Sequence, residues 1–101
     1  MAAVLTSKQR AFLMAQASKE RAVIQIGKDG LTPEVTGAVE EALAARELVK
    51  IGVQKSCLEE PRDLAQALSE RTRSALVQTI GRKIVLYKRA HEPAGRMELP
   101  K

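Results

Sequence analysis

The four residues Gly27-Lys28-Asp29-Gly30 combine features that could hold a phosphate group. Glycine tolerates positive φ and has no side chain to block an approaching ligand. Thr32 and Pro33 follow, and they are typical of a helix N-terminus, where backbone N–H groups and the helix dipole favour anions. Lys28 adds a charge that can reach a phosphate oxygen. The GXXG loop of KH domains clamps a nucleic-acid backbone by the same logic.

Two interpretations of this loop are open on its residues alone. Short connections from a strand to a helix often contain glycine, so the loop could be an ordinary tight turn. Asp29 at its tip repels phosphate unless the carboxylate turns away and bonds its own backbone. The charge of the whole chain favours a polyanionic partner, because 17 Lys and Arg outweigh 12 Asp and Glu to give a formal net charge of +5.

The sequence offers little for catalysis or metal binding. The single histidine, His91, lies in a polar C-terminal stretch without a group to orient it as a base. Cys57 is the one cysteine and has no partner at a spacing typical of metal or redox sites. The glycine loop lacks the spacing of a P-loop. Glu40, Glu41 and Glu47 have the spacing of a solvated helix face. We therefore expect no enzyme, no cofactor and no metal site.

Length and composition indicate one small domain. The 101 residues fit a single domain, and a lone thiol suits a reducing compartment. The N-terminus lacks the pattern of a signal peptide, and no apolar run is long enough to span a bilayer. We expect a cytoplasmic protein without membrane contact and, by default, a monomer.

Three segments are predicted to be helical. Thr6 and Gln9 have the spacing of a capping box at the start of the first. Thr32 and Pro33 begin the second, whose apolar face repeats at helical spacing: Val35, Ala38, Val39, Ala42 and Leu43. Pro61 begins the third.

Four short apolar runs between and after these helices are predicted strands. Residues 22–26 form a nearly continuous apolar run, which is typical of a strand covered on both faces. Residues 49–53 alternate, so one face of that strand should be buried and the other exposed. The runs "ALVQTI" and "KIVLYK" are separated only by Gly81 and Arg82, which predicts a hairpin.

The resulting order, α-β-α-β-α-β-β, predicts an α/β fold of the α+β two-layer kind. Strands joined through a helix run parallel with right-handed connections, so the first three strands should share one direction. The hairpin makes the fourth antiparallel. We expect a mixed four-stranded sheet with three helices over residues 1–89, followed by a polar tail over residues 90–101.

The scarcity of aromatic residues limits how this chain could bind RNA. Tyr87 is the only aromatic residue in a predicted strand, so the sheet cannot stack bases as an RRM does. Binding should instead depend on phosphate and shape contacts and therefore strongly on salt. The predicted contacts are the loop and its basic surroundings: Lys8, Arg10, Gly27, Lys28, Asp29, Gly30, Arg82, Lys83, Lys88 and Arg89.

Four motifs in order carry a resemblance to a known family. They are "LTSKQR", "VIQIGKDGLTPEV", "EALAARELVKI" and "ALVQTIGRKIVLYK". Together they resemble the CRM domain (chloroplast RNA splicing and ribosome maturation), and the chain is similar to its bacterial single-domain, YhbY-like members. The likeness covers about Leu5 to Arg89. The family often carries asparagine where this chain has Asp29.

The resemblance implies both a fold and a partner. The implied fold is similar to the C-terminal domain of translation initiation factor three. The implied activity is RNA binding through the GxxG loop and the adjoining basic surface, with precursors of the large ribosomal subunit as the target. The plant multi-domain relatives are associated with group II intron splicing. A single domain without a long basic extension fits the ribosomal role better than that one.

The sequence leads to one main hypothesis and two others. The main one is a non-enzymatic RNA-binding protein that binds ribosomal RNA and assists assembly of the large subunit. The alternative is a protein-interaction adaptor that docks on ribosomal or assembly proteins without touching RNA. A small-nucleotide sensor is less favoured, because no residues for base or ribose recognition stand out.

Overall fold

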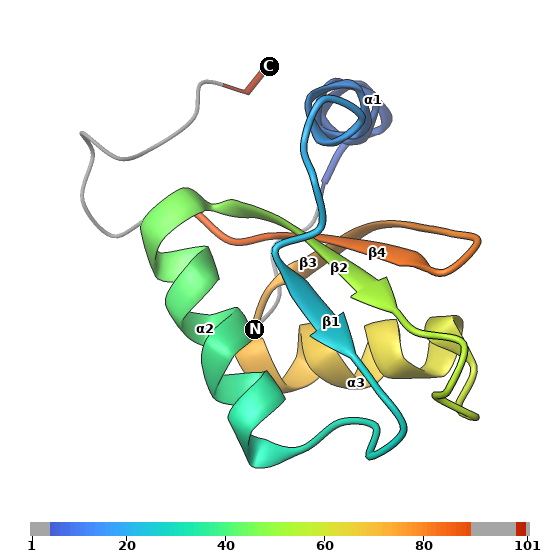
Figure 1. Cartoon of the computed structure of the whole chain (residues 1–101). Coiled ribbons are helices and arrows are strands. Elements are labelled where there is room, and N and C mark those ends of the chain that lie inside the picture. The colour runs from blue at the N-terminus through green and yellow to red at the C-terminus, as the bar shows by residue number, and fades with distance from the viewer. Residues whose placement is uncertain (1–4, 90–98, 101) are drawn as a thin grey trace.

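A mixed sheet separates one helix from the other two (Figure 1). The computed structural model describes residues 5–89 and 99–100. Within them the elements follow the predicted order: α1 Ser7–Ala17, β1 Ile24–Ile26, α2 Pro33–Arg46, β2 Leu48–Val53, α3 Pro61–Thr72, β3 Ala75–Ile80 and β4 Lys83–Tyr87. The α/β fold with three helices and a four-stranded mixed sheet is confirmed.

The strand order across the sheet is β1-β2-β4-β3. β1 pairs with β2 in parallel, and β4 is antiparallel to both β2 and β3. The first three strands therefore share one direction, as predicted. The hairpin is confirmed as well, because Ile80 pairs with Lys83 across Gly81 and Arg82. Gly81 has φ +56°, which suits the first residue of a tight hairpin turn.

The predicted helix starts are confirmed by their caps. The Gln9 N–H donates to Thr6 Oγ1 at 3.1 Å, and the Thr6 N–H donates to Gln9 Oε1 at 3.1 Å, which completes the capping box. In α2 the Val35 N–H donates to Thr32 Oγ1 at 3.1 Å. Pro61 is the first residue of α3.

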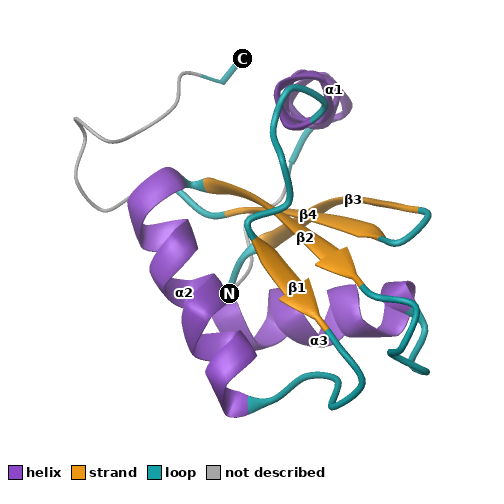
Figure 2. Cartoon of the chain, viewed as in Figure 1, coloured by secondary structure: helices purple, strands orange, loops and turns teal. Residues whose placement is uncertain are grey.

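The helices occupy both faces of the sheet, so there are three layers where the sequence predicted two (Figure 2). Helices α2 and α3 cover one face, and α1 packs against β2, β3 and β4 on the other. The reason lies in β4, which is apolar on both sides. Ile84 and Leu86 join the α2–α3 core, whereas Val85 and Tyr87 join the core beneath α1.

The first strand is shorter and less covered than its composition predicted. β1 comprises three residues at the edge of the sheet. Ile24 and Ile26 pack on the α2–α3 side, but Gln25 is exposed and Val23 is 46% exposed. The prediction of a strand covered on both faces is wrong, because α1 lies over β2, β3 and β4 and leaves this part of β1 open.

Glu47 also differs from its prediction. It was expected on a solvated helix face, but it is 1% exposed and forms the C-cap of α2 with φ 61°. Its carbonyl oxygen accepts a hydrogen bond from the Lys88 N–H at 2.9 Å. The chain turns from α2 into β2 at this residue, and that turn is buried against the end of β4.

The tail predicted over residues 90–101 lies largely outside the described residues, and so does His91. Leu99 is described, and it packs against the core beneath α1. Cys57 is a free, buried thiol in the α2–α3 core. In the described part of the chain, no helix has the length and apolar character that crossing a membrane requires.

Candidate nucleic-acid interface

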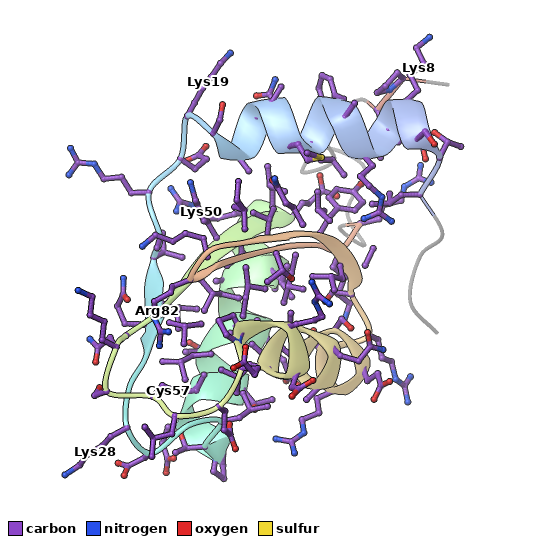
Figure 3. The ribbon with its side chains drawn as sticks, turned by 90° about the vertical axis from the view of Figure 1, so that its right-hand side faces the viewer. Lys8, Lys19, Lys28, Lys50, Cys57 and Arg82 are labelled. Atoms are coloured by element: carbon purple, nitrogen blue, oxygen red, sulfur yellow. The ribbon has the colours of Figure 1, made fainter. Side chains whose placement is uncertain are left out.

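The glycine loop is a closed turn between β1 and α2. The Gly30 N–H donates to the Gly27 carbonyl at 3.0 Å, which leaves Lys28 and Asp29 exposed at the tip. Gly30 has φ +68°, a conformation that favours glycine. In Figure 3 Lys28 points away from the body of the protein into solvent. Lys28 is therefore presented to solvent at the tip of a hydrogen-bonded turn.

The N-terminus of α2 contributes less to anion binding than its sequence suggested. Pro33 has no N–H, and Thr32 takes up the Val35 N–H. Two of the first three helical positions thus offer no amide to a ligand. A phosphate at this loop would depend mainly on Lys28 and on the backbone of the turn.

Side chains from the β2–α3 loop lie against both glycines. A Cβ atom on Gly27 would come within 3.0 Å of Gln54 Oε1, and one on Gly30 within 3.0 Å of Glu59 Oε2. In the protein without a ligand, side chains of the β2–α3 loop thus occupy the space next to both glycines. Gln54 and Glu59 are both exposed, so each has freedom to move when a ligand approaches.

One flank of the loop is acidic. A groove of about 520 Å³ runs between the loop and α3, and Asp29, Glu59, Glu60 and Asp63 line it together with Arg71. These five side chains carry a formal net charge of −3. The negative charge of this flank repels a polyanion such as a nucleic-acid backbone.

Three of the predicted contact residues are held by backbone carbonyls. Arg10 Nη1 donates to the carbonyls of Leu76 and Val77, each at 2.6 Å, at the irregular point of β3. Lys88 Nζ donates to the Thr72 carbonyl at 3.0 Å, at the end of α3. These cations stabilise the fold, and only their remaining N–H groups are available to a ligand.

Arg82 is the third. Its Nε donates to the Val53 carbonyl at 2.8 Å, and its Nη2 donates to the carbonyls of Gln54 and Cys57. The hairpin residue therefore fastens the loop that carries Gln54 and Glu59. Arg82 therefore acts on the glycine loop indirectly. It positions the loop whose side chains Gln54 and Glu59 lie against Gly27 and Gly30.

The remaining predicted cations, Lys8, Lys28, Lys83 and Arg89, are exposed. They do not form one patch. Figure 3 places Lys8 at one end of α1 and Lys28 at the opposite corner of the molecule. Lys83 begins β4 at the hairpin, and Arg89 follows the end of that strand.

Two cations that sequence reasoning missed lie on the same side as Lys28. Lys19 follows the C-terminus of α1 and is exposed, and Lys50 lies between α1 and the sheet (Figure 3). Lys50 Nζ is 3.4 Å from each of the carbonyls of Ala17 and Glu20. The alternation of β2 did place Lys50 away from the α2–α3 core. That α1 would end above it could not be read from the spacing.

The described residues contain no group of three or more His, Cys, Asp or Glu side chains that could hold a metal ion. Their fold and their surface define a small three-layer α/β domain with an exposed glycine loop that carries a lysine at its tip. That class can be narrowed by comparison. The model of the CRS1 / YhbY (CRM) domain matches residues 5–88, and the chain belongs to this family.

Its relatives are small bacterial proteins. The chain is 44% identical to "Probable RNA-binding protein YqeI" of Bacillus subtilis, over 96% of this chain and 100% of that protein. It is 35% identical to an "RNA-binding protein" of Haemophilus influenzae, over 96% of each. A solution structure of a Staphylococcus aureus protein matches with 38% identity and a TM-score of 0.80, over 96% of this chain and 100% of that one. The predicted family is confirmed.

Proposed function

We propose that this chain is a non-enzymatic, cytoplasmic RNA-binding protein that binds ribosomal RNA in precursors of the large subunit and assists their assembly. Membership of the CRM family and the names of the bacterial relatives support RNA as the partner. The observation that carries the proposal is the exposed Lys28 on the closed turn between Gly27 and Gly30. Lys28 has no hydrogen-bond partner among the described residues, so it can bind a phosphate without breaking a contact within them.

The interface extends from the glycine loop along one side of the molecule. Lys28 and Lys19 mark its two ends in Figure 3, with Lys50 between them. The acidic groove lies on the other flank of the loop and limits the RNA to this side. Lys83 adds an exposed charge at the hairpin. The RNA backbone follows these charges, so affinity should fall as salt rises.

The test is a charge reversal with a matched control. Lys28→Glu should weaken RNA binding about tenfold or more, because it removes one phosphate contact and places a like charge there. Arg62→Glu makes the same change of net charge on an exposed residue of α3, between Glu60 and Asp63. It should leave the affinity nearly unchanged. Fluorescence anisotropy with a labelled single-stranded ribosomal RNA fragment measures both, and circular dichroism checks the fold.

The salt dependence separates phosphate contact from a general loss of affinity. Lys28→Ala should lower the slope of log K against log salt by about 0.7 for a single strand. Equal weakening by Lys28→Glu and Arg62→Glu would mean that only net charge matters. In that case the glycine loop has no special role.

The ribosomal target needs a test in cell lysate. Sucrose-gradient sedimentation should show the protein with large-subunit precursors at low salt and at the top of the gradient at high salt. RNase treatment before fractionation should release it. Association that survives RNase would favour the protein-interaction adaptor, and a protein at the top of the gradient at every salt concentration would refute the ribosomal target.

A further inference from the structure

Helix α1 covers only part of its face of the sheet, and the rest of that face is not covered by a helix. One row of residues crosses all four strands there, with Gln25 paired to Gly52, Gly52 to Lys83, and Lys83 to Ile80. Gly52 has no side chain, and the amide of Gln25 lies over it, 2.5 Å from where a Cβ would stand. Ile80 is 57% exposed. The row forms a partly apolar strip.

A groove leads from this strip under the last turns of α1. Its floor is the next row of the sheet, Lys50, Val85 and Gln78, together with Ile80. Its roof comes from α1 and includes Met14. The groove has a volume of about 430 Å³, a size that fits small flat ligands. Apolar atoms predominate in its lining.

The rim of the groove is cationic. Lys50 lies in the groove itself, Lys83 belongs to the open row, and Lys19 follows the end of α1. The one carboxylate next to them in sequence is that of Glu20, which is exposed. An apolar groove with lysines around its mouth is complementary to a ligand with an apolar, flat body and an anionic link. A nucleotide in a single strand has this chemistry.

We infer that this groove accepts an unpaired base of the bound RNA, so that the chain prefers single-stranded RNA to a duplex. The inference rests on the proposed function. Ile80 and the thioether of Met14 contact the faces of the base, and the buried Val85 forms the bottom of the groove. The Gln78 amide can both donate to and accept from its edge. Lys83 and Lys19 hold the adjoining phosphates, and the site needs no aromatic residue for stacking.

A duplex does not fit this site. Its bases are stacked and paired, and α1 roofs the groove against a helix of that width. The sequence predicted binding through phosphate and shape alone, because strand aromatics are nearly absent. The groove instead supplies aliphatic and thioether contacts that the aromatic count does not reveal.

The experiment compares two serine substitutions on three probes. Ile80→Ser removes the apolar contact at the groove, and Leu58→Ser is the matched control on the acidic flank, where Leu58 is 94% exposed. The probes are a labelled single-stranded oligoadenylate, the same strand paired with oligouridylate, and a ribose-phosphate strand of equal length without bases. Because both side chains are largely exposed, both variants should keep their melting temperature.

The expected results separate the base from the phosphates. Ile80→Ser should weaken binding of the oligoadenylate about fivefold and leave binding of the baseless strand unchanged, whereas Leu58→Ser changes neither. Wild-type protein should bind the single strand more tightly than the duplex. The Met14 methyl signal in NMR spectra should shift with oligoadenylate and not with the baseless strand.

Equal affinity for all three probes, or an unshifted Met14 methyl signal at saturation, would overturn the groove as a base site. Lys28→Glu distinguishes this failure from failure of the proposed function. If it still weakens binding of the baseless strand, the phosphate interface stands and only the groove is refuted. If wild-type protein binds none of the probes, both are refuted.

Discussion

Replacing Arg82 with alanine tests whether this cation stabilises the loop before α3 or contacts RNA directly. The sequence predicts a cation that contacts RNA. In the structure the Arg82 guanidinium donates to the carbonyls of Val53, Gln54 and Cys57 and fastens the loop before α3. We therefore expect Arg82→Ala to lower the free energy of unfolding, with any loss of RNA affinity following from the displaced loop.

The size of the effect follows from these hydrogen bonds. A hydrogen bond from a charged donor contributes about 1.5–3 kcal/mol when it is buried. Arg82 is only partly buried and Gln54 is exposed, so water replaces part of what is lost. A total of about 2 kcal/mol is reasonable for the three bonds, which shifts the melting temperature by about 8–16 °C in a domain of this size.

Urea unfolding followed by circular dichroism measures the free energy, and anisotropy with ribosomal RNA measures affinity at a temperature where the variant is folded. Lys83→Ala is the control, because Lys83 is the adjacent residue and is exposed. It should leave stability within about 0.5 kcal/mol of the wild type. A stable Arg82→Ala variant that loses RNA affinity as strongly as Lys28→Glu would refute the structural role and restore the direct contact.

Three further substitutions test other parts of the structure. Glu59→Gln removes a carboxylate that lies against Gly30, so RNA affinity should rise about threefold in anisotropy titrations, as expected for a charge about 6 Å from a phosphate in water; an unchanged affinity would place the RNA elsewhere. Arg10→Ala removes the two hydrogen bonds to β3 and should cost about 1–3 kcal/mol in urea unfolding, against no change for Lys8→Ala. Arg73→Gly places glycine at the C-cap of α3, where φ is 55°, and should stabilise the protein by about 0.5–1 kcal/mol. Arg73→Ala should give no such gain, and an equal gain from it would show that the backbone conformation is not the cause.

The elements of the fold could be predicted because their signals are local. Helix starts are indicated by residues that lie close together in the sequence, Thr6 with Gln9 and Thr32 with Pro33. Gly81 and Arg82, between two apolar runs, indicate the hairpin in the same way. The direction of the first three strands follows from the crossovers between them.

The third layer could not be predicted in this way, because it depends on pairing between distant strands. The hairpin brings β4 between β2 and β3, so β4 becomes an inner strand and must be covered on both faces. Val85 and Tyr87 then need a partner, and α1 supplies it. The apolar run of β1 looked equally buried in the sequence, but β1 took the edge of the sheet and left Gln25 exposed.

The candidate site shows the same division between local and distant information. The glycine loop was visible as a motif, whereas the roles of its cations depend on which carbonyls the fold brings near them. Arg10, Arg82 and Lys88 each meet carbonyls at least 16 residues away in sequence. A basic composition therefore overstates how much charge is available to RNA. Lys28 is the predicted cation whose exposure and position on the loop both favour binding, and for this reason its reversal is the most informative single substitution.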